Sequence, residues 1–349
     1  MLRLGPFEFE LPFVQAALSG YSDLPMRRLA RRMGAPYALN EVMLDRLVLQ
    51  PGKKRKEMLY VAPDDHPVGG QLMGADPEVF GPAASELAKA GYDVIDINFG
   101  CPVKKVLGRC RGGFLLSQPE TALSIVQSVF DAVGEIRPVT MKMRRGMDDK
   151  PESERNFFEI LDGALSIGVT AVTVHGRTVQ QRYVGPSRWE FLRRVKRHVG
   201  NTTILGSGDL FTAEDCMRMM EETGVDGVTI ARGCIGNPWI FEDCRALWNG
   251  EELPPPPSIA QQREAIEGHW RDSVSVYGQE QAGKIMRKFG IKYAEHHPLY
   301  PQVKQAFIDV KTTAEFEDAL DRWYDPAADW PEVVRREGPG DLVAAGACA

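Results

Sequence analysis

Cysteine is scarce in this chain, with 6 among 349 residues. The six stand at positions 101, 110, 216, 234, 244 and 348, without a CxxC pair and without the spacing of zinc ligands. This pattern argues against a disulfide framework and favours a reducing compartment. We therefore expect a cytoplasmic protein that has no metal site.

Long hydrophobic runs are also missing. No segment reaches the ~18 uninterrupted apolar residues that a membrane-spanning helix needs. The apolar part of the N-terminus is interrupted by Glu8 and Glu10, which argues against a signal peptide. We expect no membrane association.

An overall excess of positive charge is lacking as well, since the formal net charge is −6. Taken alone, this disfavours a nucleic-acid partner. The basic residues are nevertheless clustered, and any one cluster is more often a solvated face than a binding site. Only several clusters brought together on one rim of the molecule would indicate a positive surface. The basic clusters of the sequence lie at 27–32, 53–56, 104–111, 142–145 and 193–198.

What the chain does contain is a regular alternation of strand-like and helix-like segments. Eight short apolar, β-rich runs recur in the first ~235 residues, with amphipathic stretches such as 76–92, 119–133 and 213–224 between them. This predicts an α/β fold of the (β/α)8 TIM barrel class. A doubly wound sheet is the alternative, but no GxGxxG turn follows the first strand. The predicted strands are 12–18, 37–42, 67–74, 94–100, 138–144, 171–177, 202–209 and 227–232.

A proline run at 254–257 separates the barrel from a smaller part. Helical patterns at 258–278, 280–296 and 313–324 follow it. We expect a catalytic barrel domain over 1–250, a small C-terminal helical domain over 258–325, and a flexible tail over 335–349.

The segment "DVIDINFGCPVKKV" (93–106) carries the clearest chemical signal. Its apolar run ends at Asn98, and Cys101 then stands on a Gly–Pro corner instead of inside the strand. Because barrel enzymes place their chemistry at the C-terminal ends of strands, a thiol there is a candidate catalytic group. Lys142, between Met141 and Met143 on the fifth strand, is expected to point into the barrel mouth, since a buried lysine without a role is rare.

The last two strand ends, "GSGDLFTAED" and "ARGCIGNPW", are rich in glycine. Exposed backbone N–H groups and a following helix N-terminus suit a phosphate there, and the loops after strands seven and eight are the usual phosphate site of barrels. Glycine alone also serves plain turn geometry, so the joint position of the two loops carries the prediction.

Five segments in order resemble the tRNA-dihydrouridine synthases: "INFGCPVKKV…GGFLL", "PVTMKMRRG", "VTVHGRTVQQRYVGPSRW", "GSGDLFTAED" and "DGVTIARGCIGNPWIF". The resemblance covers residues 12–245 closely and 258–325 loosely. It implies an FMN-dependent barrel that reduces the C5=C6 bond of particular uridines in tRNA, with NADPH as electron donor. It also implies tRNA as partner; we expect a monomer.

The resemblance assigns roles to individual residues. Cys101 matches the catalytic cysteine, which gives a proton to C5 after hydride from reduced FMN reaches C6; a thiol suits this task because its pKa is not far from neutrality. Lys142 matches a contact that stabilises anionic reduced flavin. The residues expected at the cofactor are Ala17, Leu18, Ser19, Gln71, Asn98, Lys142, His175, Ser207, Gly208, Asp209, Ala231, Arg232 and Gly233.

A reduced uridine has to leave its stack, so a positive surface beside the pocket is expected. The candidate substrate or RNA contacts are Lys104, Lys105, Arg144, Arg177, Tyr183 and Arg287. Two other functions remain open at this point: a flavin-dependent reductase of a free pyrimidine or small enone, and a non-catalytic RNA-binding barrel.

Overall fold

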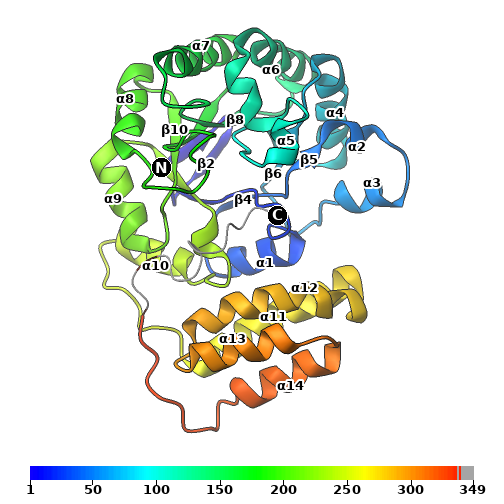
Figure 1. The fold of residues 1–349 in the computed structure, drawn as a ribbon, viewed down its shortest axis with the longest axis vertical. Coiled ribbons are helices and arrows are strands. Elements are labelled where there is room, and N and C mark those ends of the chain that lie inside the picture. The colour runs from blue at the N-terminus through cyan, green and yellow to red at the C-terminus, as the bar shows by residue number, and fades with distance from the viewer. Residues whose placement is uncertain (336–337, 339–349) are drawn as a thin grey trace.

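The computed structural model describes residues 1–335 and residue 338, and its centre is a closed barrel of parallel strands (Figure 1). Eight strands pair in a ring, each with its neighbours in the chain, and the last pairs with the first. They are β3 (Phe13–Gln15), β4 (Tyr37–Leu39), β6 (Val68–Met73), β7 (Val94–Phe99), β8 (Val139–Arg144), β9 (Ala171–His175), β10 (Thr203–Ser207) and β11 (Gly227–Ile230). The predicted TIM barrel is confirmed.

Helices cover the outside of this ring, as Figure 1 shows for α4 and α6 to α9. The two-residue strand β5 (Met43–Leu44) adds to the edge of β6. The connections carry α1 (Leu24–Arg32), α2 (Asp45–Leu49), α3 (Lys53–Met58), α4 (Pro77–Ala90), α5 (Lys104–Leu107), α6 (Pro119–Val133), α7 (Pro151–Ile167), α8 (Trp189–Val199), α9 (Ala213–Thr223) and α10 (Ile240–Trp248), with short 3-10 turns η1 (Gly112–Ser117) and η2 (Arg232–Cys234).

Local sequence explains where these helices begin and end. Asp76 caps the first turn of α4 by accepting from the Glu78 N–H, and Pro77 occupies the first helical position. The helix stops at Gly91, whose φ of +103° is one that side-chain-bearing residues rarely adopt. Thr212 and Asp215 form a reciprocal capping box at the start of α9.

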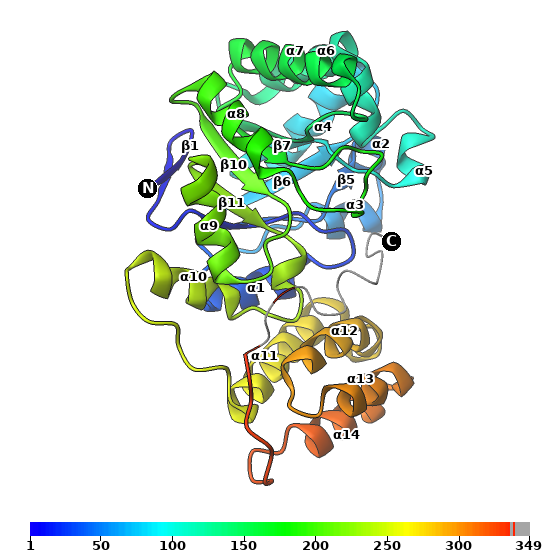
Figure 2. The same cartoon turned by 60° about the vertical axis from the view of Figure 1, so that its left-hand side comes forward.

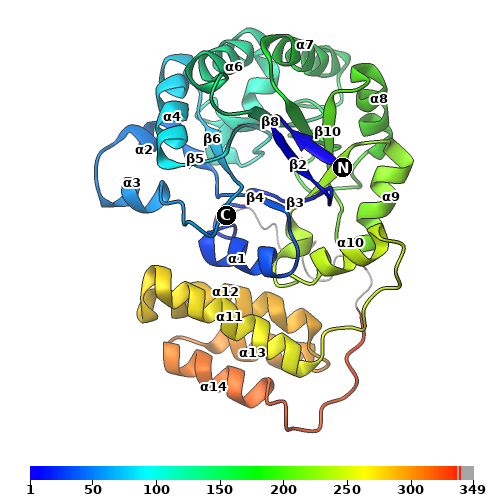
Figure 3. The same ribbon diagram turned by 180° about the vertical axis from the view of Figure 1, so that it is seen from behind.

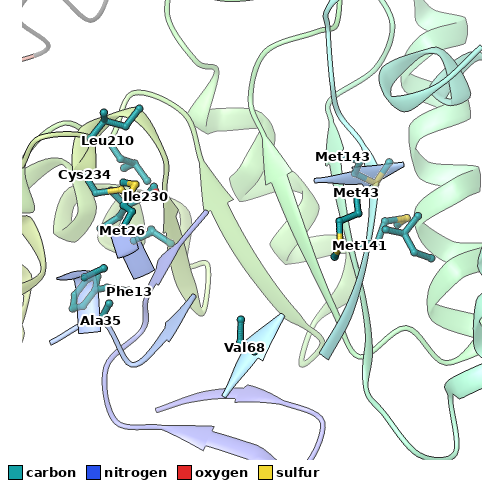
Figure 4. Close-up of a cluster of buried hydrophobic side chains, with 14 of the residues drawn as sticks. Phe13, Met26, Ala35, Met43, Val68, Met141, Met143, Leu210, Ile230 and Cys234 are labelled. Carbon is teal, nitrogen blue, oxygen red and sulfur yellow. Dashed lines mark hydrogen bonds between the residues drawn. The ribbon is translucent and has the colours of Figure 1, made fainter. Parts of the chain in front are cut away.

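Alternation along the strands separates two environments. In β7, the apolar side chains Ile95, Ile97 and Phe99 join the core between barrel and helices. Asp96 and Asn98 face the barrel interior instead, where they form hydrogen bonds. Figure 4 shows part of the outer core, with Met141 and Met143 of β8 on one side and Phe13, Met26 and Cys234 on another.

A hairpin that the sequence patterns did not predict closes the N-terminal end of the barrel. Its strands β1 (Leu2–Leu4) and β2 (Phe7–Phe9) pair antiparallel, and Figure 3 shows them across the barrel end. Leu2, Leu4 and Phe9 pack in a separate core with residues of the barrel strands, such as Val94 and Leu205.

The C-terminal part of the described chain is helical and lies against α1 (Figures 1 and 2). It comprises α11 (Ile259–Tyr277), α12 (Gln279–Tyr293), the 3-10 turn η3 (Ala294–His296), α13 (Tyr300–Asp309) and α14 (Thr313–Trp323). Predicted helices match α11, α12 and α14, whereas α13 was not predicted. The predicted tail, 335–349, lies outside the described residues apart from Arg335 and Gly338.

Contacts across this junction reach the loop after β3. Tyr277 donates a hydrogen bond to Asp23 Oδ2 at 2.9 Å, and the rings of Tyr21 and Phe289 meet edge to face at 5.5 Å. Lys288 donates to the backbone oxygen of Gly20. Within the residues described, no helix has the length and apolar character to cross a membrane.

Candidate active site

A pocket opens at the C-terminal ends of the barrel strands, and most of the predicted site residues line it. Since the strands converge there, residues far apart in the sequence share one wall. The predicted cofactor and catalytic residues on this wall are Ala17, Leu18, Ser19, Gln71, Asn98, Cys101, Lys142, His175, Ser207, Gly208, Asp209, Ala231 and Arg232; the predicted RNA contacts Arg144 and Tyr183 line it too.

Cys101 stands on a loop whose backbone is held from several sides. The N–H groups of Gly100 and Cys101 both donate to Asn98 Oδ1, at 3.0 and 3.1 Å. Arg144 Nε donates to the Gly100 carbonyl at 3.0 Å. A Cβ at Gly112 would lie 2.9 Å from the Cβ of Cys101, and the φ of Gly112 is +57°, so only glycine fits beside the thiol.

Lys142 reaches the pocket from the middle of β8. Its Nζ donates to Ser207 Oγ at 3.3 Å. Burial, reinforced by the nearby Arg144 cation, lowers the pKa of Lys142 to about 8, while Asp96 acts in the opposite direction. The ammonium form still predominates at neutral pH, so Lys142 brings positive charge into the pocket.

His175 is expected to be neutral. Burial and the cations around it, Arg144 first, hold the pKa of its imidazole well below the usual range. Arg177 Nη1 lies 3.4 Å from His175 Nε2. Because a guanidinium can only donate, this contact makes Nε2 the acceptor and leaves the proton on Nδ1.

The loops after β10 and β11 meet closely. Gly208 has a φ of +111°, and a Cβ there would lie 2.4 Å from Ser187 Oγ and 2.8 Å from His175. A Cβ at Gly233 would lie 2.2 Å from the carbonyl oxygen of Leu210. Both loops therefore depend on glycine, and they bring backbone and the Arg232 guanidinium to the same edge of the pocket.

Positive charge dominates this wall. Three cations line it against one carboxylate, Asp209, which is already held by two 2.7 Å bonds from Arg177. The surplus suits an anionic ligand. The lining cations are Lys142, Arg144 and Arg232, whereas Arg177 and the carboxylate of Asp96 are buried and do not line the pocket.

The sequence matches the family model described as "Dihydrouridine synthase (Dus)" over residues 14–328. A probable tRNA-dihydrouridine synthase of Mycobacterium tuberculosis (strain CDC 1551 / Oshkosh) is 34% identical over 330 residues, which cover 92% of this chain and 84% of that protein. The chain belongs to the dihydrouridine synthase family. Another relative, tRNA-dihydrouridine synthase B of Proteus vulgaris, is 31% identical over 326 residues, covering 93% of this chain and 98% of that protein.

Solved structures of the same barrel type include morphinone reductase in complex with tetrahydroNAD. It superimposes with a TM-score of 0.54 at 15% sequence identity, covering 73% of this chain and 91% of that chain. At such low identity the likeness concerns the fold.

In this member of the dihydrouridine synthase family, some predicted residues lie outside the pocket. Arg177 is 4% exposed and donates hydrogen bonds to Asp209 and to the Gly185 carbonyl, so it stabilises the loop after β10. Lys104 and Lys105 are exposed on α5, just after the Cys101 corner. Arg287 lies on α12 and donates to the backbone oxygen of Ile308. Gly233 is buried in η2, next in the chain to the lining residue Arg232.

Several residues at this site were not singled out from the sequence. Tyr21 and Phe211 line the pocket, and Arg232 lies 4.4 Å from the Tyr183 ring and 5.1 Å from the Phe211 ring. Asp96 lies beneath the pocket wall, bonded to Gln71. The signal for Asp96 was present, because a carboxylate inside an otherwise apolar strand needs buried partners.

Proposed function

We propose that this protein is an FMN-dependent tRNA-dihydrouridine synthase that reduces the C5=C6 bond of specific uridines in tRNA with electrons from NADPH. The observation that carries the proposal is the single pocket in which Cys101, Asn98, Lys142 and the glycine loops after β10 and β11 come together. Family membership supports the same reaction.

The residues present fit a flavin mononucleotide. The glycine loops, with Arg232, would hold the phosphate, because their backbone comes close to the pocket where an added side chain at Gly208 would clash with Ser187 and His175. Lys142 would hold negative charge on the ring, as would the Nδ1 proton of His175. Bound FMN, once reduced, would supply the hydride to C6 of the uracil.

The chain's own part in the reaction is proton transfer and orientation. Cys101 would give its thiol proton to C5, on the side of the base away from the flavin. Asn98 holds the Cys101 backbone through two N–H bonds, which limits the movement of the thiol. Arg144 fixes the same loop through the Gly100 carbonyl and packs 5.5 Å from the Tyr183 ring, beside the space for the base.

Binding of tRNA is supported by exposed cations near the pocket mouth. Lys104 and Lys105 on α5 and Arg109 just after it follow Cys101 in the chain and are exposed. A groove between barrel and helical region is lined by Arg28 and Lys53, among others. We propose that residues 1–250 act as the catalytic domain and 258–325 as the RNA-binding domain, in a monomer working in the cytoplasm.

The test starts from purified protein, FMN, NADPH and tRNA that lacks dihydrouridine. We expect a yellow protein that forms dihydrouridine, measured by mass spectrometry of digested RNA, and little reduction of free uridine. A protein that stays colourless when FMN is supplied would contradict the proposal. Equal activity on free uridine would instead support a small-molecule reductase.

The second arm of the test is Cys101→Ala. We expect FMN and tRNA binding to be retained and single-turnover reduction to slow by at least ~100-fold, the usual contribution of a positioned proton donor. Cys110→Ala is the matched control, because Cys110 is an exposed thiol on the same loop. Unchanged turnover of Cys101→Ala would remove Cys101 from the mechanism.

A further inference from the structure

Asp96 lies inside the barrel, in the middle of β7, and the reaction proposed above does not use it. The residue is 3% exposed. Its Oδ1 accepts a hydrogen bond from Thr140 Oγ1 at 2.6 Å, and its Oδ2 accepts from Gln71 Nε2 at 2.7 Å. Both neighbours stand beside it in the strand register, Gln71 on β6 and Thr140 on β8.

The bond to Gln71 is the first link of a longer chain. Gln71 Oε1 accepts from Asn98 Nδ2 at 2.7 Å. Asn98 Oδ1 in turn accepts from the N–H groups of Gly100 and Cys101, at 3.0 and 3.1 Å. Two side-chain amides thus connect the buried carboxylate of Asp96 to the peptide unit that carries Cys101.

The direction of this chain is set at both ends. An ionised carboxylate only accepts hydrogen bonds, so Asp96 turns the amino group of Gln71 towards itself and the oxygen of that amide towards Asn98. Backbone N–H groups only donate, so Asn98 has to turn its oxygen towards Cys101. Amide nitrogen and oxygen have nearly the same shape, so such an end group decides which way an amide points.

The groups around Asp96 favour its ionised carboxylate, which is the form that orients the two amides in this way. Burial raises the pKa of Asp96, and the hydrogen bonds from Thr140 and Gln71 oppose that rise, as does the Lys142 ammonium. Its partners therefore all favour the ionised carboxylate.

We propose that Asp96 is a positioning residue that, through the amides of Gln71 and Asn98, fixes the peptide unit carrying Cys101 at the pocket wall. The consequence for catalysis rests on the function proposed above: a fixed peptide keeps the thiol at a constant distance from C5 of the base. The chain itself does not depend on that function.

The sharpest test moves the carboxylate from one end of the chain to the other. Asp96→Asn puts an amide at the inner end, which can present either nitrogen or oxygen to Gln71. Asn98→Asp sets a carboxylate against the oxygen of Gln71, so two acceptors face each other.

In the double variant, Asp96→Asn with Asn98→Asp, every group can be satisfied again. The new amide at 96 accepts from Thr140 and donates to Gln71, which flips. Gln71 then donates to the new carboxylate at 98, and this carboxylate also accepts from the N–H groups of Gly100 and Cys101.

The measurement is hydrogen–deuterium exchange of the Gly100 and Cys101 amides at single-residue resolution, in the purified full chain. We expect exchange in the two single variants to be at least ~10-fold faster. In Asp96→Asn, nothing fixes which atom Asn98 turns to the two N–H groups, and in Asn98→Asp two facing acceptors repel each other and displace the side chain at 98. The double variant should return to within ~3-fold of wild type, since contacting residues are coupled. A double variant that exchanges as fast as the faster single variant would overturn the proposal, as would two single variants that exchange like wild type.

Asp93→Asn is the matched control, because Asp93 precedes the same strand at its other end and bonds to the Val68 N–H. It should leave the Gly100 and Cys101 amides unchanged. If a single variant does not fold, the yield of folded double variant replaces its exchange rate: a folded double variant supports the coupling, and an unfolded one overturns it. Exchange needs neither RNA nor NADPH, so a wild-type protein inactive on tRNA would refute the proposed function and leave this result standing.

Discussion

Replacing Lys142 by methionine should make the flavin-free protein more stable. Methionine has nearly the same length, and it removes an ammonium group from a site where burial and Arg144 disfavour charge. The fall of the Lys142 pKa from 10.5 to about 8 corresponds to ~3 kcal/mol at ~1.4 kcal/mol per pKa unit. The bond to Ser207 is lost and Lys142 is partly exposed to the pocket, so we expect a net gain of ~2 kcal/mol near neutral pH.

The gain should depend on pH in a defined direction. The unfolded chain keeps the lysine proton up to pH 10.5, whereas the folded chain loses it near pH 8. Wild-type stability therefore rises relative to Lys142→Met as the pH increases between these values, and the gap between the two proteins closes.

The assay is urea unfolding of flavin-free protein, followed by circular dichroism, at a neutral and at an alkaline pH. Lys53→Met is the control, because the Lys53 side chain is 91% exposed and its charge is solvated. A Lys142→Met variant no more stable than wild type near neutral pH would contradict this prediction, as would a difference in stability that stays constant with pH. Added FMN should also narrow the difference in stability between the two proteins, because the variant lacks the cation that we propose holds the flavin.

Three further predictions concern the surroundings of the pocket. Gly208→Ala should weaken FMN binding and lower the melting temperature. Its control is Gly200→Ala, which has a φ of +62° but no atom within 4 Å of the added Cβ and so reports backbone strain alone. Equal effects of the two substitutions would contradict a role of the Gly208 loop in phosphate binding. Burial raises the pKa of Asp23 to about 6, so wild-type stability should fall relative to Asp23→Asn as the pH rises from 4 to 6, by up to ~3 kcal/mol; parallel curves in thermal melts would disprove this. Replacing Lys104 and Lys105 by alanine should reduce the slope of log K against log salt for tRNA by ~1–2, and an unaltered slope would exclude both as phosphate contacts.

Most of the barrel could be predicted because its strands are apolar, β-branched runs that alternate with amphipathic helices. The second strand was expected over 37–42, but its ladder ends at Leu39. Asn40 follows and turns its side chain to Arg27 and Tyr92, so the chain leaves the sheet there.

The missed elements have weak local signals. Each strand of the N-terminal hairpin has 3 residues, too few to show a period, and its apolar side chains are explained by the barrel end that they cover. Helix α13 buries only Val303 and Phe307 from its 10 residues, so its pattern is faint without the helices around it.

The residues of the site could also be predicted only in part. Polar residues at strand ends could be recognised because their position in a barrel already implies a pocket. The contacts of Arg177 could not, since its partner Asp209 stands 32 positions further along the chain. The sequence shows that Asp96 stands in an otherwise apolar strand, but its partners Gln71 and Thr140 are identified only once β6 and β8 lie beside β7.

The N-terminal hairpin has a kinetic consequence for the proposed reaction. Because Leu2, Leu4 and Phe9 close the N-terminal end of the barrel, the proposed nicotinamide donor and RNA would both approach a bound flavin from the pocket at the C-terminal ends of the strands. Two substrates that share one pocket bind in turn, so we expect no complex that holds the nicotinamide donor and the RNA together. Initial-rate plots at several fixed tRNA concentrations should accordingly give parallel lines.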